Sequence, residues 1–583
     1  MKGYFAFVFQ FICLMAYAQT DIVWWKPSPS YYSELDGMGW PNEKRDAIQR
    51  LPSRFQSLVS PSIWEGSQKG SGLSIRFISN APEIVVRYTC VPSSSKRKIP
   101  AVAARGVDLY AIDSDGLWHR AAGNASLSDS VQYVFSQLRP NDFFHKLGRA
   151  YQLFLPLFSS IGNLQIGVPQ GSLFKMIPMR AEKPIVVLGS SIVQGEGATR
   201  PGMSWTNILS RKLDRNVINL GFSDKDLLDN SLVDLIGGMD ARIFVFDGML
   251  ELGNESFDSA HMVRTITDAV RSIRSKHPQT PILCSEHAGY SDDYLLPARQ
   301  LLSDRANRIV QAAMNQLKKE SITAVYLLSR RDIGMGMEDM SDGEYPNDMG
   351  MMRYAEAYEK KMREIFKEPV GTLKTQIPIR QRRTPAGYDW EGRHRSMLAL
   401  NKTESNKILL IGNSITHNWG GKPNTKSNAS WQKYLAPYDV RNFGFGADRI
   451  ENVLWRIYHD ELSDIHPEKI LINIGTNNLR VNSNEEIIEG LRFLIQVLKV
   501  HQPNAEITLL GIYPRRDYED RIILINKSLR KMTGAESVRF ADIGKDMFLE
   551  NRKVNEALFN DGLHPNADGY EILGMQLQKL LKK

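Results

Sequence analysis

The sequence predicts an α/β protein with two three-layer α/β/α domains built on parallel sheets, preceded by an N-terminal β-sandwich. Short β-like runs, separated by clusters of Gly, Pro, Ser and Asn, fill the first third of the chain and favour an antiparallel sandwich. From about residue 181, apolar runs alternate with helical patterns, which indicates a parallel sheet. The same alternation begins again after a segment rich in Pro, Arg and Thr, so we expect two copies of one architecture.

These changes of pattern give the expected domain boundaries. They are a signal peptide at 1–18, a sandwich at 19–180, a first α/β copy at 181–370, a linker at 371–386 and a second α/β copy at 387–583.

The N-terminus has the pattern of a cleavable signal peptide. Lys2 supplies a basic start, an apolar run extends from Tyr4 to Ala16, and Ala16-Tyr17-Ala18 is a small-x-small cleavage site. The run is shorter than the roughly 20 residues that a membrane-spanning helix needs. We therefore expect cleavage after Ala18, a periplasmic or secreted protein, and no stable insertion into a membrane.

Charge and cysteine content argue against several classes of protein. A net charge of +8 over 583 residues is typical of an ordinary solvated surface. The basic clusters 96–98 and 380–383 have no interleaved aromatic residues, so we do not expect nucleic-acid binding. Cys90 and Cys284 remain after cleavage and fall in different domains, so stability should come from hydrophobic cores rather than disulfides.

The sandwich is predicted from β-like runs at 73–77, 83–87, 107–110 and 151–155. Its aromatic residues could form a sugar-stacking face or could pack in cores and between domains, and we favour packing. The residues in question are Trp24, Trp25, Trp64 and Trp118.

Each α/β copy is predicted from strands followed by amphipathic helices. In the first copy we expect strands at 184–188, 217–220, 242–246 and 281–284, with helices at 205–213 and 262–277. In the second copy we expect strands at 407–412, 439–443, 469–474, 505–512 and 537–541, with a closing helix at 568–581.

Ser414 lies in the expected turn between the first strand of the second copy and the helix that follows it. The apolar run 408–411 ends at Gly412, and polar residues follow at once. In an open α/β sheet, binding and chemistry occur at the carboxyl ends of the strands. Serines after strands are common, so Gly-Asn-Ser is weak evidence alone, and its weight depends on the blocks downstream.

Four polar blocks follow one another in the second copy, and together they are specific. They are Gly412-Asn413-Ser414-Ile415, the segment 442–448 (Asn-Phe-Gly-Phe-Gly-Ala-Asp), Gly475-Thr476-Asn477-Asn478 and Asp561-Gly-Leu-His564-Pro565-Asn566. Over 400–583 the chain resembles the SGNH/GDSL hydrolase family, most closely its platelet-activating-factor-acetylhydrolase-like branch. The resemblance implies a flavodoxin-like α/β/α fold for each copy.

The chemistry of acyl transfer fits these blocks. It needs a nucleophile, a base, a group that orients the base, and donors for the oxyanion. Ser414 would be the nucleophile and His564 the base, with Asp561, three residues earlier on the same turn, fixing its tautomer. By resemblance, the oxyanion donors are the N–H groups of Ser414 and Ala447 and the side-chain amide of Asn477.

The second copy departs from the family at two positions. Asn413 replaces the usual aspartate of Gly-Asp-Ser, which leaves the triad untouched because its acid is Asp561. Ala447 replaces the glycine of the second block. A backbone donor survives the added methyl group if φ is ordinary, so we expect a working oxyanion hole. The other histidines show no metal-ligand spacing, and we expect neither a metal nor a cofactor.

The first copy resembles another SGNH subfamily that carries a sandwich before it, but its site is degenerate. Ser191 stands at the nucleophile's position, and Asp342 stands in the last block, where Tyr345 replaces the histidine. A phenol is a poor base at neutral pH. Asp224 and Glu251 also replace the family's glycine and asparagine, and a carboxylate would repel the oxyanion.

From this degeneracy we hypothesise that the first copy is catalytically inactive and serves as a scaffold or glycan-holding domain. A rescue through His287, which follows the strand 281–284, is an alternative that we rate lower.

These observations predict a secreted serine esterase that removes O-acetyl or other short acyl groups from carbohydrates, with an acetylated carbohydrate as its partner. The family hydrolyses many esters, so the substrate rests on analogy. The alternatives are a sialate O-acetylesterase, for which Arg449 could bind a carboxylate, a lysophospholipase or short-chain lipase, and a non-catalytic glycan-binding protein. The sequence leaves the oligomeric state open.

Overall fold

The computed structural model describes residues 21–582 except 33–34, 44, 46, 93–98, 114, 140–147, 224–227, 249–252, 255, 257, 384–387, 406 and 536–537. The expected signal peptide and the basic cluster 96–98 lie outside the described residues. Within them, the strands form four five-stranded sheets, two antiparallel and two parallel.

The N-terminal domain is built from the two antiparallel sheets, of order β1-β9-β3-β7-β6 and β10-β2-β8-β4-β5. The first sheet holds β1 (Ile22–Trp25), β3 (Ile84–Pro92), β6 (Asn124–Leu127), β7 (Ser130–Phe135) and β9 (Ser159–Pro169). The second holds β2 (Ser74–Ser79), β4 (Asp108–Ile112), β5 (Trp118–Ala121), β8 (Arg149–Phe154) and β10 (Phe174–Met176). Alternate side chains of both sheets, such as Phe77, Val86 and Ile166, share one core, which is how sandwiches pack. Short helices α1 (Pro29–Tyr32), α2 (Pro61–Ser67) and α3 (Ala101–Arg105) accompany the sheets.

The first α/β copy has a parallel sheet of order β12-β11-β13-β14-β15. Its strands are β11 (Ile185–Gly189), β12 (Val217–Gly221), β13 (Ile243–Asp247), β14 (Ile282–Ser285) and β15 (Val325–Leu328). Its helices are α4 (Ser191–Gln194), α5 (Trp205–Leu213), α6 (Asn230–Ile236), α7 (Ser259–Lys276), α8 (Pro297–Lys319), α9 (Arg330–Ile333) and α10 (Asp348–Phe366).

The second copy repeats this topology as β17-β16-β18-β19-β20. Its strands are β16 (Ile408–Gly412), β17 (Val440–Gly444), β18 (Lys469–Asn473), β19 (Glu506–Leu510) and β20 (Arg539–Ala541). Its helices are α11 (Trp390–Asn401), α12 (Ser414–Trp419), α13 (Ala429–Tyr434), α14 (Ile450–Arg456), α15 (Asn484–His501), α16 (Glu519–Ala535) and α17 (Ala567–Leu581). In both copies the second strand lies outside the first, which is the flavodoxin-like order.

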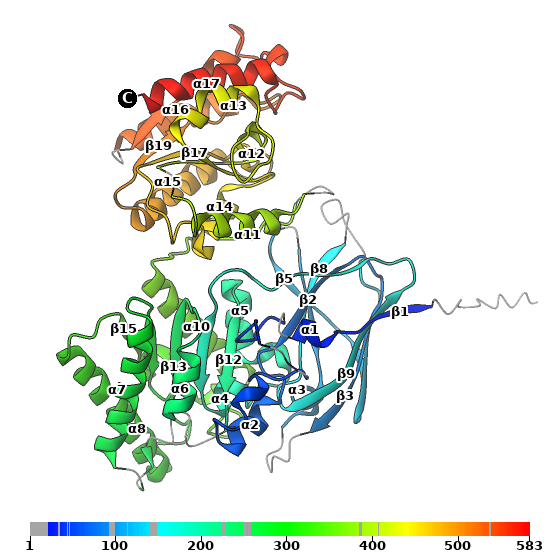
Figure 1. Cartoon of the computed structure of the whole chain (residues 1–583), viewed down its shortest axis with the longest axis vertical. Helices are drawn as coiled ribbons and strands as arrows, with labels where there is room; N and C mark the ends of the chain where they lie inside the picture. Colours follow the sequence, from blue (N-terminus) through cyan, green and yellow to red (C-terminus); the bar gives the residue numbers. More distant parts are fainter. Residues whose placement is uncertain are drawn as a thin grey trace, which may run out of the picture.

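Each parallel sheet is covered by helices on both faces, because its strands are apolar on both sides. In the second copy, Leu409 and Ile411 of β16 face a core with α14, α15 and α16, while Ile408 and Leu410 face a core with α12, α13 and α17. In the first copy, α6, α7 and α8 cover one face, and α5 and α10 cover the other. Figure 1 shows the second copy, yellow to red, above the green first copy and the blue sandwich.

Glycine at the ends of the first two strands lets the following helix turn pack close to the sheet. A Cβ on Gly444 would lie 2.4 Å from the backbone nitrogen of His417, and one on Gly221 would lie 2.2 Å from that of Gln194. Gly444 pairs with Gly412 and Gly221 with Gly189, so both copies use the same device. The turn after the first strand is thereby held tightly against the second strand.

An arginine from outside each sheet caps this region in both copies. Arg393 of α11 donates to the carbonyl of Gly444 and to Asn442. Arg50, which lies between β1 and β2 of the sandwich, donates to the carbonyl of Gly221 and to Asn219. The sandwich domain therefore contributes a buried side chain to the first copy.

The segment that we expected to link the two copies is packed between them. Arg380, Gln381 and Arg383 are buried, and Thr375 donates to the carbonyl of Glu486 on α15. This segment is thus part of the interface, which a sequence rich in Pro, Arg and Thr does not suggest.

The two cysteines that remain after the expected cleavage, and the four tryptophans considered above, pack against other side chains of the protein. Cys90 and Cys284 are free and buried. Trp25 packs on the sandwich core and Trp64 on the core of the first copy, as the packing interpretation predicted, and Arg87 lies over the ring of Trp24. Among the described residues, no helix has the length and apolar character needed to cross a bilayer.

Candidate active site

Ser414 is the first residue of α12, directly after β16. Asn413 caps this helix, since its side-chain oxygen accepts a hydrogen bond from the N–H of Ile415 at 2.9 Å. Asn413 is buried, so the residue that replaces the family's aspartate has a structural role. The Ser414 side chain is half-buried at the carboxyl edge of the sheet.

The structure brings the three expected triad residues together. The Ser414 hydroxyl lies 2.9 Å from Nε2 of His564, and Nδ1 of His564 lies 2.7 Å from Oδ2 of Asp561. Asp561 and His564 lie in the loop before α17, and the N–H groups of Leu563 and His564 donate to Oδ1 of Asp561. The side chains of His564 and Asp561 are 30% and 53% exposed, so the pair is open to solvent.

The charge on Asp561 is stabilised by this arrangement. Burial opposes ionisation, but hydrogen bonds from the backbone and the ring of His564 outweigh it and hold the pKa of Asp561 below its ordinary value. An ionised Asp561 can only accept, so Nδ1 of His564 carries the proton and Nε2 presents its lone pair to Ser414.

The three expected oxyanion donors follow three neighbouring strands. Ser414 comes after β16, Ala447 after β17 and Asn477 after β18, and the sheet order β17-β16-β18 places their carboxyl ends side by side. Among the described contacts, no protein acceptor is recorded for the N–H of Ser414 or of Ala447. Asn477 Nδ2 donates one hydrogen to the carbonyl of Asp448 at 2.9 Å, which leaves its second hydrogen for a ligand.

The backbone of Ala447 differs from our expectation of an ordinary φ. Its φ is +63°, in the left-handed region that favours glycine. A left-handed conformation costs an L-residue about 1–2 kcal/mol. The N–H survives, but the surrounding structure must hold this residue in place.

A buried polar group lies directly behind this strained residue. Asp448 is 0% exposed, and its carboxylate accepts from Nε1 of Trp390 at 2.7 Å and from Nε of Arg456 at 2.9 Å. Burial raises the pKa of Asp448 to about 7, against the opposing charge of Arg456. Asp448 belongs to the second polar block of the sequence, where its pattern indicates no role for it. No sequence signal shows that Trp390 and Arg456, 58 residues before and 8 residues after it, are its partners.

Arg449 does not offer a free cation to a ligand. Its guanidinium lies 3.6 Å from Asp115 of the sandwich and 3.7 Å from Glu451, and its side chain is 12% exposed. Arg449 was the residue that suggested a substrate with a carboxylate, but its guanidinium is already paired with two carboxylates of the protein.

The first copy retains the backbone of the site without its base. Ser191 begins α4 as Ser414 begins α12. Asp342 accepts from the N–H groups of Glu344 and Tyr345, as Asp561 does from Leu563 and His564. Tyr345 stands in the histidine's place and is buried in the core with α10.

The other features of the first copy differ further from the second. Asp247, opposite Gly189, occupies the position that Asn473 has opposite Gly412. Its carboxyl is buried and accepts from Ser285 and Tyr358, and burial raises its pKa to about 6. Asp224 and Glu251 lie outside the described residues.

His287 is committed to the interior of the first copy. Its Nδ1 accepts from the N–H of Gly289 at 3.0 Å, and its ring packs on Tyr290. Burial, with the charge of Arg330, lowers its pKa to about 4. Among the described side chains, no hydrogen bond joins His287 to Ser191, so this geometry gives the rescue no support. The described residues also contain no cluster of three or more His, Cys, Asp or Glu side chains that could hold a metal ion.

Comparisons with known proteins agree with this architecture. Models of the GDSL-like lipase/acylhydrolase family match residues 182–363 and 410–572, and a model of the N-terminus of SGNH-hydro-type esterases matches 22–174. The platelet-activating factor acetylhydrolase IB subunit alpha2 of Rattus norvegicus is 25% identical over 197 residues, which cover 33% of this chain and 83% of that protein. The alpha1 subunit of Homo sapiens is 24% identical over 197 residues, covering 33% of this chain and 82% of that protein.

A solved structure has the same fold. The crystal structure of a Bacteroides ovatus protein classed as a GDSL-like lipase aligns with a TM-score of 0.53 and 24% identity. It covers 60% of this chain and 98% of its own.

Proposed function

The chain belongs to the SGNH/GDSL hydrolases, the GDSL-like lipase/acylhydrolase family, through both of its parallel-sheet domains, and we propose that it is a serine esterase whose active site lies in the second. The observation that carries the proposal is the chain of contacts from Ser414 to His564 to Asp561. This is the constellation that activates a serine hydroxyl for acyl transfer.

In the acylation step the Ser414 oxygen attacks the ester carbonyl, and Nε2 of His564 takes the hydroxyl proton. Asp561 stabilises the imidazolium that forms and keeps its ring oriented. The tetrahedral oxyanion accepts hydrogen bonds from the N–H groups of Ser414 and Ala447 and from Nδ2 of Asn477. The alcohol leaves with the proton from His564, and an acyl-serine remains.

In the deacylation step His564 takes a proton from water, which attacks the acyl-serine carbonyl. The same donors stabilise the second oxyanion, and the proton returns to Ser414 as the acid leaves. Each residue keeps its role in both steps, so one arrangement serves the whole cycle.

We further propose that the acyl group is short and that the alcohol is a carbohydrate. The named relatives are acetylhydrolases, which supports acetyl as the acyl group. The expected signal peptide and the additional sandwich domain support an exported enzyme that acts on acetylated glycans. The first copy is proposed to be non-catalytic, because Tyr345 occupies the place of the base and, in the sequence, Glu251 replaces the asparagine that the family uses in its oxyanion hole.

A substrate panel tests the ester class. Purified protein is incubated with acetylated xylan, O-acetylated sialic acid, a lysophospholipid and p-nitrophenyl acetate, and released acid is quantified. Acetate release from the acetylated glycan supports the proposal. Preferential release of acetate from sialic acid, or of fatty acid from the lysolipid, would favour those alternatives, and no hydrolysis at all would favour a glycan-binding protein.

The same assay tests the first copy. Ser414→Ala should abolish turnover, and Ser191→Ala should leave it unchanged. Residual turnover in Ser414→Ala that disappears when Ser191→Ala is added would refute the non-catalytic assignment.

A further inference from the structure

The loop that carries the Ala447 donor accepts hydrogen bonds from residues outside the second α/β copy. We name Phe445–Arg449 the oxyanion loop. Gln381 Nε2 donates to the carbonyl of Gly446 at 2.9 Å, and Arg383 Nη2 donates to the carbonyl of Ala447 at 3.4 Å. Both donors are buried and belong to the segment between the two α/β copies. The backbone on either side of the strained residue is therefore fixed by that segment.

Asp448 connects the two kinds of oxyanion donor. Its carbonyl orients the amide of Asn477, and its backbone is joined directly to Ala447. Its carboxylate is anchored on Trp390 and Arg456, as described above. A shift of Asp448 would therefore displace the Ala447 N–H and the Asn477 amide together.

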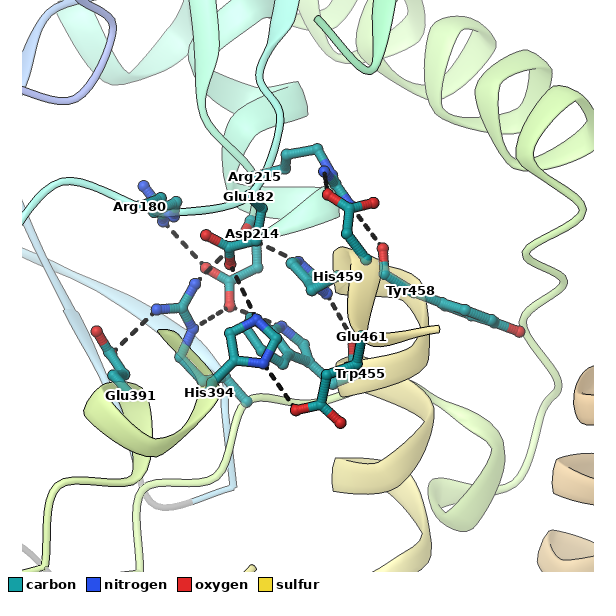
Figure 2. A network of polar contacts seen from close by, with 12 residues as sticks. Arg180, Glu182, Asp214, Arg215, Glu391, His394, Trp455, Tyr458, His459 and Glu461 are labelled. Carbon is teal, nitrogen blue, oxygen red and sulfur yellow. Dashed lines mark hydrogen bonds and ion pairs between the residues drawn. The ribbon is translucent and has the colours of Figure 1, made fainter. Parts of the chain in front are cut away.

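These supports continue into the first copy. Arg380, next to Gln381, donates through Nε to Oδ2 of Asp214 at 2.7 Å. Asp214 is the C-cap residue that follows α5 of the first copy, and it also accepts from Nε1 of Trp455 at 2.9 Å and from Arg180 at 3.0 Å. Figure 2 shows Asp214 facing Trp455 and His459 of the second copy. The segment that donates hydrogen bonds to the oxyanion loop is thus also bound, through Arg380, to the carboxylate of Asp214 in the first copy.

A second chain of contacts connects the first copy to the oxyanion loop through Arg456, which donates to the carboxylate of Asp448. Arg456 also pairs with Glu461, whose Oε1 lies 2.9 Å from Nδ1 of His394. Nε2 of His394 lies 3.9 Å from Glu182, which precedes the first strand of the first copy (Figure 2). Two chains of contacts therefore run from the domain interface to the oxyanion loop, and they lie side by side where Asp214 accepts from Trp455, the neighbour of Arg456.

The burial of these groups makes their geometry specific. The side chains of Arg380, Arg456, Glu461 and His394 are 1–4% exposed, and that of Asp214 is 14% exposed. In such an interior, an ion whose partner is lost is left uncompensated, so the paired arrangement is strongly preferred over alternatives. Strained residues such as Ala447 persist only where the surroundings over-determine them.

From these contacts we propose that the first α/β copy, together with residues 371–383, is a positioning platform for the oxyanion loop of the second. Gln381 positions the oxyanion loop by donating to the carbonyl of Gly446. Asp214 positions it indirectly, because it binds Arg380, the neighbour of Gln381. The proposal rests on the proposed esterase function, and it gives the non-catalytic copy a role in the reaction.

The experiment compares two matched substitutions at the interface, Asp214→Asn and Asp460→Asn. Both aspartates have left-handed φ, +48° and +70°, which asparagine tolerates. Both accept from arginines in the interface, Asp214 from Arg180 and Arg380, and Asp460 from Arg215. Among the described contacts, Asp460 bonds none of the groups that hold the oxyanion loop, so it controls for weakening of the interface.

We expect Asp214→Asn to lower kcat for p-nitrophenyl acetate about tenfold while KM stays within about twofold, because a small displacement of a donor affects the transition state most. Asp460→Asn should lower the thermal unfolding midpoint comparably and leave kcat within about twofold. Gln381→Leu, which removes only the donor to Gly446, should reproduce the kcat loss, and it decides the question if Asp214→Asn does not fold.

Three outcomes would overturn the proposal. These are equal kcat losses in Asp214→Asn and Asp460→Asn, no kcat loss in Gln381→Leu, or a loss confined to KM. Turnover and covalent labelling of Ser414 are measured first on the wild-type protein. Wild-type protein that shows neither would reject the esterase function, whereas the three outcomes above reject the positioning platform in an active esterase.

Discussion

The carboxylate of Asp561 binds His564 twice, once through the backbone N–H and once through Nδ1, each at 2.7 Å. The first contact fixes the turn and the second fixes the ring, so the three-residue spacing sets both position and tautomer. As a result Nε2 faces the Ser414 hydroxyl as an acceptor.

Asp561→Asn should lower kcat by about 10²–10⁴-fold, because an amide that donates to Nδ1 would stabilise the wrong tautomer. The matched control is Asp342→Asn, which alters the equivalent turn of the first copy and should leave kcat within about twofold. Steady-state kinetics on p-nitrophenyl acetate measures both. Equal effects of the two substitutions would contradict the role of Asp561 in orienting the base, His564.

Asn477→Ala should lower kcat by about 10²–10³-fold with little change in KM, the usual cost of removing one oxyanion donor. Its amide donates to Asp448 and has one hydrogen left for the oxyanion. A kcat within about threefold of the wild-type value would show that the amide does not contact the reacting group.

Ala447→Gly should keep the activity and should not lower the free energy of unfolding. Its φ of +63° costs alanine about 1–2 kcal/mol, whereas glycine adopts it freely, and this gain offsets the extra entropy of glycine in the unfolded chain. The control is Ala312→Gly at an exposed position within α8, which should cost about 1 kcal/mol. Denaturant unfolding compares the two, and a larger loss at Ala447 would contradict the strain argument.

His287→Gln should make the protein less sensitive to acid. The pKa of His287 is lowered to about 4, while histidine in the unfolded chain has a pKa of about 6.5. Between these values the unfolded chain binds a proton that the folded chain does not, so stability falls as pH falls from about 6.5 to about 4. The loss through this residue is up to about 3 kcal/mol.

The test of this effect is the thermal unfolding midpoint of wild type and His287→Gln across that pH range. Glutamine can still accept from the N–H of Gly289, and the variant should show the shallower decline. Parallel declines would indicate that other groups cause the acid sensitivity.

Local patterns in the sequence were enough to predict much of the fold and the contacts at the core of the site. Strands 408–412 and 469–473 lie within the expected ranges, because continuous apolar runs bounded by glycine or asparagine indicate buried parallel strands. Asp561 and His564 could be paired because three residues separate them on one turn. Helix α8 and strand β15 were not anticipated.

The interface that supports the site could not be predicted from the sequence. Arg380, Gln381 and Arg383 fall in a polar stretch that is typical of a linker, and buried ion pairs have the same composition as solvated charges. Their partners, such as Asp214 and Gly446, lie 166 and 65 residues away. The left-handed φ of Ala447 depends on the same tertiary contacts, so the assumption of an ordinary φ was wrong.

Covalent labelling tests the central assignment most directly. Intact protein is treated with a fluorophosphonate probe, digested, and the modified residue is located by mass spectrometry, with His564→Gln as the control for activation. We expect modification of Ser414, none of Ser191, and loss of labelling in His564→Gln. An unmodified Ser414, or labelling that is unaffected by His564→Gln, would contradict the assignment of Ser414 as a nucleophile activated by His564.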